Sequence, residues 1–212
     1  LVSSANANVK LPSWAEKITK KLPTPATTLN PFVTNLANGL KIIVQPEAVS
    51  DTVSVYGRVK NNPKVQMPRG EDGVDSALDQ LFSYGTKTLG RLAFQKALDD
   101  IGANESAGAD FSLQVLPEHF DRGVQLLADN ELSPALPEKD FKIIQPQLAA
   151  QVAGELQSPD HIAGHALTLA WFPKTDPATR ETMPASVKSL TLDDVKNYFH
   201  AAFRPELTTI VV

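Results

Sequence analysis

The stretch from Gly73 to Thr86, GVDSALDQLFSYGT, constrains the fold more than any other part of the chain. Its apolar side chains recur with the spacing of one helical face, at Val74, Ala77, Leu78, Leu81 and Phe82. The opposite face carries acidic and other polar side chains, at Asp72, Asp75, Ser76, Asp79, Gln80 and Ser83. Gly85 can supply the left-handed turn that ends such a helix. The stretch therefore predicts an amphipathic helix with one buried face and one polar face.

The order of the other predicted elements indicates the fold class. Asn38-Gly39 lies between two apolar runs, which is a strong signal for a β-hairpin because both residues accept positive φ. Residues 52–60 alternate between apolar and polar side chains, as a half-buried strand does. Further periodic segments predict strands over 105–116 and 207–212, and helices over 89–101, 117–132, 138–157, 160–172 and 191–203. This order predicts an α+β fold, with a mostly antiparallel sheet and helices packed on one of its faces.

Composition and charge narrow the function classes. Of the 212 residues, 42% are hydrophobic and 21% are charged, a balance that can build a real core. The net charge is −4 and there is no basic block, so nucleic acid is not an expected partner. No apolar run comes near the length of about 18 residues that a membrane span needs. The absence of cysteine excludes disulfides and cysteine-bound metals, and leaves the compartment open.

The ends of the chain differ from its middle. Residues 1–30 are rich in Ala, Asn, Ser, Thr and Pro, which is typical of a linker or N-terminal arm. Residues 31–212 carry all the strong periodic patterns and are expected to form a single αβ domain. The chain begins with Leu1 rather than Met, and it stops inside the strand predicted over residues 207–212. We therefore expect a fragment of a longer protein.

The helix at residues 73–86 resembles the zinc helix of the pitrilysin/insulinase family of metallopeptidases, the inverted zincins. That helix carries the signature H-x-x-E-H, in which two histidines bind zinc beside a general-base glutamate. When Gly73 and Gly85-Thr86 are aligned with the family pattern, Ser76 and Gln80 occupy the histidine positions and Asp79 the glutamate position. The hairpin at Asn38-Gly39, residues 101–107 and the helix after Leu190 follow the same order as in the family. The resemblance covers about residues 30–212.

The resemblance implies a degenerate metal site without catalytic residues. A serine hydroxyl and a glutamine amide are poor zinc ligands, and Asp79 is one methylene shorter than glutamate. The family's third ligand is a glutamate on a later helix. Counting along the chain from the second histidine position places this ligand at Glu155, whereas alignment on the local helix pattern places it at Gln151 or Ala150. We expect no metal or other cofactor in this chain.

A second candidate metal site comes from the residues alone. His161 and His165 are four residues apart on a predicted helix, a spacing that metal sites use, and Glu155 is near them in sequence. No H-E-x-x-H arrangement surrounds them, so they give only a weak alternative site. The sequence has no nucleophile elbow, P-loop or dinucleotide-binding motif in the required context.

Three functional hypotheses remain. Enzymes of the family pair homologous αβ domains around a peptide, and one half often carries a degenerate motif. The resemblance thus implies a non-catalytic domain that completes a peptide-binding chamber and stabilises the active half, with zinc in a partner domain of the same polypeptide or another subunit. The alternatives are a structural or assembly subunit with no peptidase partner, and a metal-dependent peptidase using His161, His165 and Glu155. A periplasmic or secreted bacterial location is preferred over a cytoplasmic one.

Overall fold

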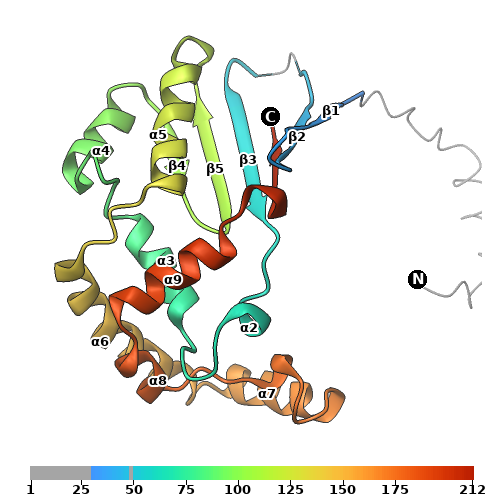
Figure 1. Ribbon diagram of the computed structural model, residues 1–212, viewed down its shortest axis with the longest axis vertical. Helices are drawn as coiled ribbons and strands as arrows, with labels where there is room; N and C mark the ends of the chain where they lie inside the picture. The colour runs from blue at the N-terminus through green and yellow to red at the C-terminus, as the bar shows by residue number, and fades with distance from the viewer. Residues whose placement is uncertain (1–29, 48–49) are drawn as a thin grey trace, which may run out of the picture. The chain divides into compact units, whose positions relative to one another are not determined.

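The computed structural model describes residues 30–47 and 50–212 (Figure 1). The arm expected over residues 1–30 therefore lies, apart from its last residue, outside the described residues. Within the described part, the helices are α2 (Pro63–Gln66), α3 (Val74–Phe82), α4 (Arg91–Asp99), α5 (Phe120–Leu132), α6 (Glu138–Glu155), α7 (Pro159–Trp171), α8 (Pro184–Ser189) and α9 (Leu192–Ala202). No helix in this part of the chain is long and apolar enough to cross a membrane.

The strands form one six-stranded sheet in the order β1-β2-β6-β3-β5-β4. Their bounds are β1 Phe32–Asn35, β2 Lys41–Val44, β3 Val53–Val59, β4 Asn104–Ser106, β5 Asp110–Val115 and β6 Thr208–Val211. Only β2 and β6 pair in parallel among these neighbours. The predicted hairpin joins β1 to β2, and Gly39 takes a positive φ of 89° in its turn. The predicted α+β class, with a mostly antiparallel sheet, is confirmed.

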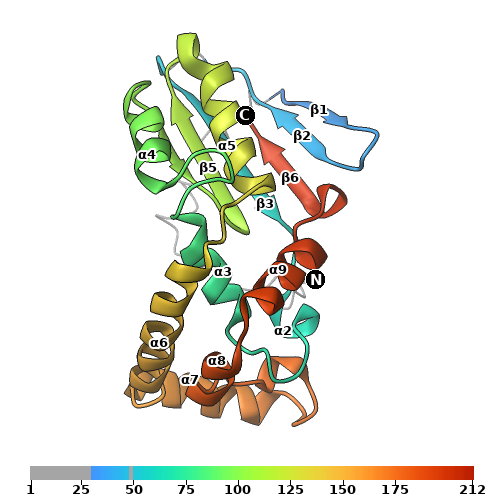
Figure 2. The ribbon, with the colours of Figure 1, turned by 60° about the vertical axis from the view of Figure 1, so that its left-hand side comes forward.

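Helices α4 and α5 cover one face of the sheet (Figures 1 and 2). Strand β3 shows why: Val55, Gly57 and Val59 are buried under these helices, whereas Tyr56 and Arg58 are exposed on the other face. Gly57 is required by close packing, because a Cβ there would lie 1.9 Å from the ring of Phe111 on the paired strand. Helices on one face and an open opposite face match the sequence prediction.

A second hydrophobic core contains no buried strand residue and is built from helices and the loops beside them. It joins α3, α6, α8 and α9 through Leu78, Leu81, Ile144, Val187 and Val195, all nearly inaccessible to solvent. Helix α9 begins with a capping box, in which the Asp194 N–H donates to Thr191 Oγ1 at 3.2 Å and the Thr191 N–H donates to Asp194 Oδ2 at 2.7 Å. This core holds α3 with its polar face free for other contacts.

Four segments differ from the sequence prediction. The strand expected over residues 105–116 is split into β4 and β5, because Gly108 takes a φ of 140° in the turn between them. Helix α4 is capped by Gly90 and begins at Arg91, while the Thr88 N–H is held by Thr86 Oγ1 in the preceding turn. The sequence pattern predicts no helix between residues 61 and 72 or between residues 173 and 190, where the short helices α2 and α8 lie.

Candidate functional site

Helix α3 forms as predicted and carries Ser76, Asp79 and Gln80, the residues that the sequence resemblance aligns with the zinc motif. Gly73 precedes it with a φ of 98°, and a Cβ at this position would lie 2.9 Å from Val187 Cγ2. The five predicted apolar residues are all buried. On the polar face, Ser76 and Gln80 are half-buried and Asp79 is exposed at the mouth of a cleft.

The residues at the family's ligand positions do not fit zinc. Ser76 and Gln80 offer only a hydroxyl and a carboxamide, and Asp79 is the one carboxylate among the three positions on α3. On α6, both alignments of the third ligand give exposed residues, and the Gln151 Nε2 donates to Glu155 Oε1 at 3.0 Å. The part of the chain that the structure describes contains no group of three or more His, Cys, Asp or Glu side chains placed to hold a metal ion.

A cleft of about 490 Å³ lies beside α3. Its walls come from α3, from α4, from β4 with the residue that follows it, and from α5. The polar lining includes Asp79, Ser83, Glu105, Ser106 and Asn130, and the apolar lining includes Phe82, Leu92, Phe94, Leu98 and Ala107. The edge strand β4 thus lines the same cleft as Asp79 of α3.

Two carboxyl groups with raised pKa values, Glu105 and Asp79, line this cleft, and a third, Glu131, lies near enough to feel their charges. Burial raises the pKa of Glu131 to about 8, with smaller contributions from the charges of Glu105 and Asp79. Burial also raises the pKa of Glu105 to about 7, although the hydrogen bond from Asn130 opposes this shift. Asp79 keeps part of its surface open, but the surrounding protein, followed by the charges of Asp75 and Asp110, raises its pKa to about 6. These carboxyl groups therefore change protonation near neutral pH.

Asn130 and Glu131 are functional candidates that the sequence prediction missed. At the end of helix α5 the apolar Leu132 is 71% exposed, whereas Glu131 is 8% exposed and Asn130 is 2% exposed. The buried positions of α5 are Gly123, Leu126, Leu127, Asn130 and Glu131, which is regular helical spacing. This spacing in the sequence could have indicated that both residues are buried, because Asn130 and Glu131 continue the helix face formed by Leu126 and Leu127.

The histidine pair lies at a separate, smaller cavity of about 150 Å³. His161 and His165 share one face of α7, and their ring centroids are 6.1 Å apart. His161 Nε2 lies 2.8 Å and His165 Nδ1 lies 3.5 Å from Glu181 Oε1. Glu155 lines this cavity, but the side chain that joins the two histidines is Glu181, in a loop without a periodic pattern. Sequence spacing therefore located the two histidines and not their carboxylate partner.

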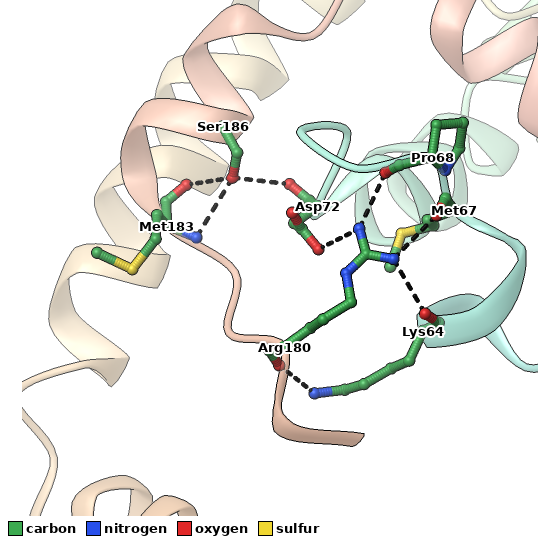
Figure 3. A network of polar contacts seen from close by, with 7 residues as sticks. All are labelled: Lys64, Met67, Pro68, Asp72, Arg180, Met183 and Ser186. Carbon is green, nitrogen blue, oxygen red and sulfur yellow. Dashed lines mark hydrogen bonds and ion pairs between the residues drawn. The ribbon is translucent and has the colours of Figure 1, made fainter. Parts of the chain in front are cut away.

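Arg180, which directly precedes Glu181 in the chain, contacts Lys64, Met67, Pro68 and Asp72, as Figure 3 shows. Its guanidinium donates to three carbonyl oxygens at 2.9–3.0 Å, those of Lys64, Met67 and Pro68. The same group forms an ion pair with Asp72 Oδ1 at 2.8 Å, directly before α3. In return, the Lys64 Nζ donates to the carbonyl oxygen of Arg180 at 2.6 Å. One arginine thus ties the α7–α8 connection to α2 and to the start of α3.

No protein-family model matches this sequence, and no curated protein matches it. Two solved structures resemble it in fold. The crystal structure of a peptidase M16 inactive domain from Pseudomonas fluorescens matches with a TM-score of 0.77 and 18% identity, over 86% of this chain and 46% of that one. The crystal structure of a protease from Helicobacter pylori matches with a TM-score of 0.70 and 19% identity, over the same shares of 86% and 46%. The chain has the fold that the family resemblance predicts, and it spans about half the length of each matched chain.

Proposed function

We propose that this chain is a non-catalytic domain of a zinc metallopeptidase of the pitrilysin/insulinase type. The observation that carries the proposal is the polar face of α3, which presents Ser76, Asp79 and Gln80 where the family's zinc helix presents two histidines and a glutamate. These side chains do not form a zinc site. The likeness in fold to a peptidase M16 inactive domain supports the same conclusion. Zinc and the catalytic glutamate then belong to a partner domain.

The role of such a domain is to complete a peptide-binding chamber and to stabilise the active half. Both matched chains are about twice as long as the part that this chain covers, which leaves room for a second domain of similar size. The cleft beside α3 and the edge strand β4 would then form part of the chamber wall. An exposed strand edge offers backbone groups to an extended peptide.

Helix α7 supports the presence of a partner. None of its residues is buried, and several apolar side chains are more than 40% exposed, namely Ile162, Leu167, Leu169, Trp171 and the following Phe172. Exposed apolar side chains gathered on one element are typical of an interaction surface. We assign this apolar helix to the contact with the catalytic domain. The half of the matched chain that this chain does not cover indicates the size of that domain.

The test is to combine the chain with the domain that carries an intact H-x-x-E-H, taken from the same polypeptide or from a neighbouring reading frame. We expect the chain alone to contain no stoichiometric zinc and to hydrolyse no peptide. We expect the two together to co-purify and to hydrolyse peptides faster than the zinc domain alone. Stoichiometric zinc and hydrolysis by this chain alone would overturn the proposal in favour of a site of its own. Stable association that leaves hydrolysis unchanged would favour the assembly-subunit alternative.

A further inference from the structure

The cleft beside α3 contains a buried acceptor that needs a donor. Asn130 lines the cleft and is 2% exposed. Its Nδ2 donates to Glu105 Oε1 at 3.1 Å, but its Oδ1 has no hydrogen-bond partner among the described residues. Native proteins satisfy nearly all buried polar atoms, so an orphan acceptor on a cleft wall indicates that a donor comes from outside the chain.

The charges of the cleft indicate which donor fits. Glu105 and Asp79 both line it, and neither takes part in the ion pairs found among the described residues. Arg91 is the only basic residue of the described lining, and its guanidinium lies over the ring of Tyr84, 5.0 Å from the centroid. The carboxyl groups are therefore available to a cationic donor.

The apolar part of the lining defines the rest of the ligand. Phe94 and Leu98 belong to the buried core and form part of the cleft wall, and Ala107 lies after β4 on another part of it. A ligand in this cleft therefore meets apolar side chains as well as carboxylates. A short aliphatic stem that ends in several N–H donors has this combination of properties.

The geometry points to a binding site for the side chain of a lysine or arginine, with its cationic end between Glu105, Asp79 and Asn130 Oδ1 and its stem against Phe94 and Leu98. This assignment rests on the proposed function, because it names the residue type of a peptide that the chamber would select. An acidic side chain would meet carboxylates here, and a purely aliphatic one would leave Asn130 Oδ1 without a donor. The raised pKa values of Glu105 and Asp79 agree with carboxyl groups that lack a cation.

The experiment is a titration of the isotopically labelled 212-residue chain, followed by NMR, at a pH above the pKa values of Glu105 and Asp79. The probes are N-acetyl-lysine methylamide and, as the uncharged control with a matching stem, N-acetyl-norleucine methylamide. We expect the lysine probe to shift the signals of the Asn130 side-chain amide and the Gly108 backbone amide. We expect the norleucine probe to bind at least tenfold more weakly.

Variants localise the effect. Glu105→Gln keeps an acceptor for the Asn130 Nδ2 and removes one charge, so it should weaken the lysine probe at least tenfold. Glu118→Gln removes the same charge from an exposed position outside the cleft lining and should leave binding unchanged. Asn130→Leu removes the orphan acceptor and should abolish the shift of the Gly108 backbone amide, while thermal melts show a folded protein.

Two results would overturn the assignment. One is equal binding of both probes, or no binding of either, which would mean that water alone supplies the donor to Asn130 Oδ1. The other is equal loss of affinity in Glu105→Gln and Glu118→Gln, which would show a general charge effect. The titration uses this chain without a zinc domain. The proposed pairing with that domain can therefore fail while binding of the lysine probe is still observed, so the two proposals can fail separately.

Discussion

The Gly108 N–H donates to Glu131 Oε1 at 2.6 Å and so ties the turn between β4 and β5 to the end of α5. Glu131 is 8% exposed, so its carboxyl is removed from water and its ionised form is disfavoured. The same turn passes close to α3, since a Cβ on Gly108 would lie 3.5 Å from Asp79 Oδ1. The protonation of this buried acid is thus connected to the packing of three elements around the cleft.

The first prediction concerns pH and stability. The pKa of Glu131 rises from 4.5 to about 8 on folding, so between these values the folded state binds more protons than the unfolded state. The stabilisation from this group is complete below about pH 4.5 and is lost as the pH rises through about 8. We expect Tm to fall by about 4 °C between about pH 5 and pH 9, which corresponds to about 1–2 kcal/mol for a chain of this size.

Glu131→Gln tests the origin of that slope. Glutamine keeps an acceptor for the Gly108 N–H and cannot ionise, so Tm should vary less with pH than in the unmodified chain. Other charged groups near Glu131, namely Glu105 and Asp79, retain their own smaller contributions. The exposed Glu118→Gln variant should keep the full slope. Equal slopes in Glu131→Gln and the unmodified chain would remove Glu131 as the cause.

The second prediction concerns the start of α3. Gly73→Ala should cost about 1–3 kcal/mol of unfolding free energy, because the residue has a φ of 98° and its Cβ would meet Val187. Gly154→Ala is the matched control, since it lies in α6 with no atom within 4 Å of the added Cβ. That variant should be neutral or stabilising by up to ~1 kcal/mol. Urea denaturation of both variants measures the difference, and similar costs would show that backbone strain at Gly73 is unimportant.

The third prediction concerns Arg180. A lysine cannot reproduce a planar group that reaches three carbonyl oxygens and Asp72 together, so Arg180→Lys should destabilise the chain by about 2 kcal/mol. Arg122→Lys is the control, because Arg122 is exposed and its guanidinium donates to Gln125 on the same helix. Thermal denaturation should separate the two variants, and hydrogen exchange should rise in α2 only for Arg180→Lys. Equal exchange in both would argue against a positioning role.

The fourth prediction concerns the proposed partner contact on α7. Trp171 is 75% exposed, so Trp171→Glu should leave the stability of this chain unchanged and weaken its association with the zinc domain at least tenfold. Leu132→Glu places the same charge at a 71% exposed leucine on α5 and should have little effect on association. Calorimetric titration measures both affinities. If both variants bind as the unmodified chain does, the contact lies elsewhere.

The sequence predicted those features that local patterns encode. The regular apolar spacing at 74–82 predicted α3, Asn38-Gly39 predicted the hairpin, and the periodic pattern at 191–203 predicted α9. It missed Glu181, because only the folded loop brings that carboxylate to His161 and His165. It also missed Asn130 and Glu131, because polar residues are expected on the protein surface. In the fold both are buried, where Glu131 accepts from the Gly108 N–H and Asn130 donates to Glu105 on the cleft wall. Contacts between distant segments thus decided the candidate site.

The last prediction restores the family's motif. Ser76→His, Asp79→Glu and Gln80→His together should fold normally, because all three positions lie on the polar face of α3 and none is fully buried. The variant should still hydrolyse no peptide as this chain alone, since the third-ligand position on α6 holds Gln151 or Glu155, already bonded to each other. Assays of zinc content and peptide cleavage check both halves of the prediction. Hydrolysis that depends on added zinc would show that three substitutions on one helix suffice, and that the rest of the fold has kept the geometry of the reaction.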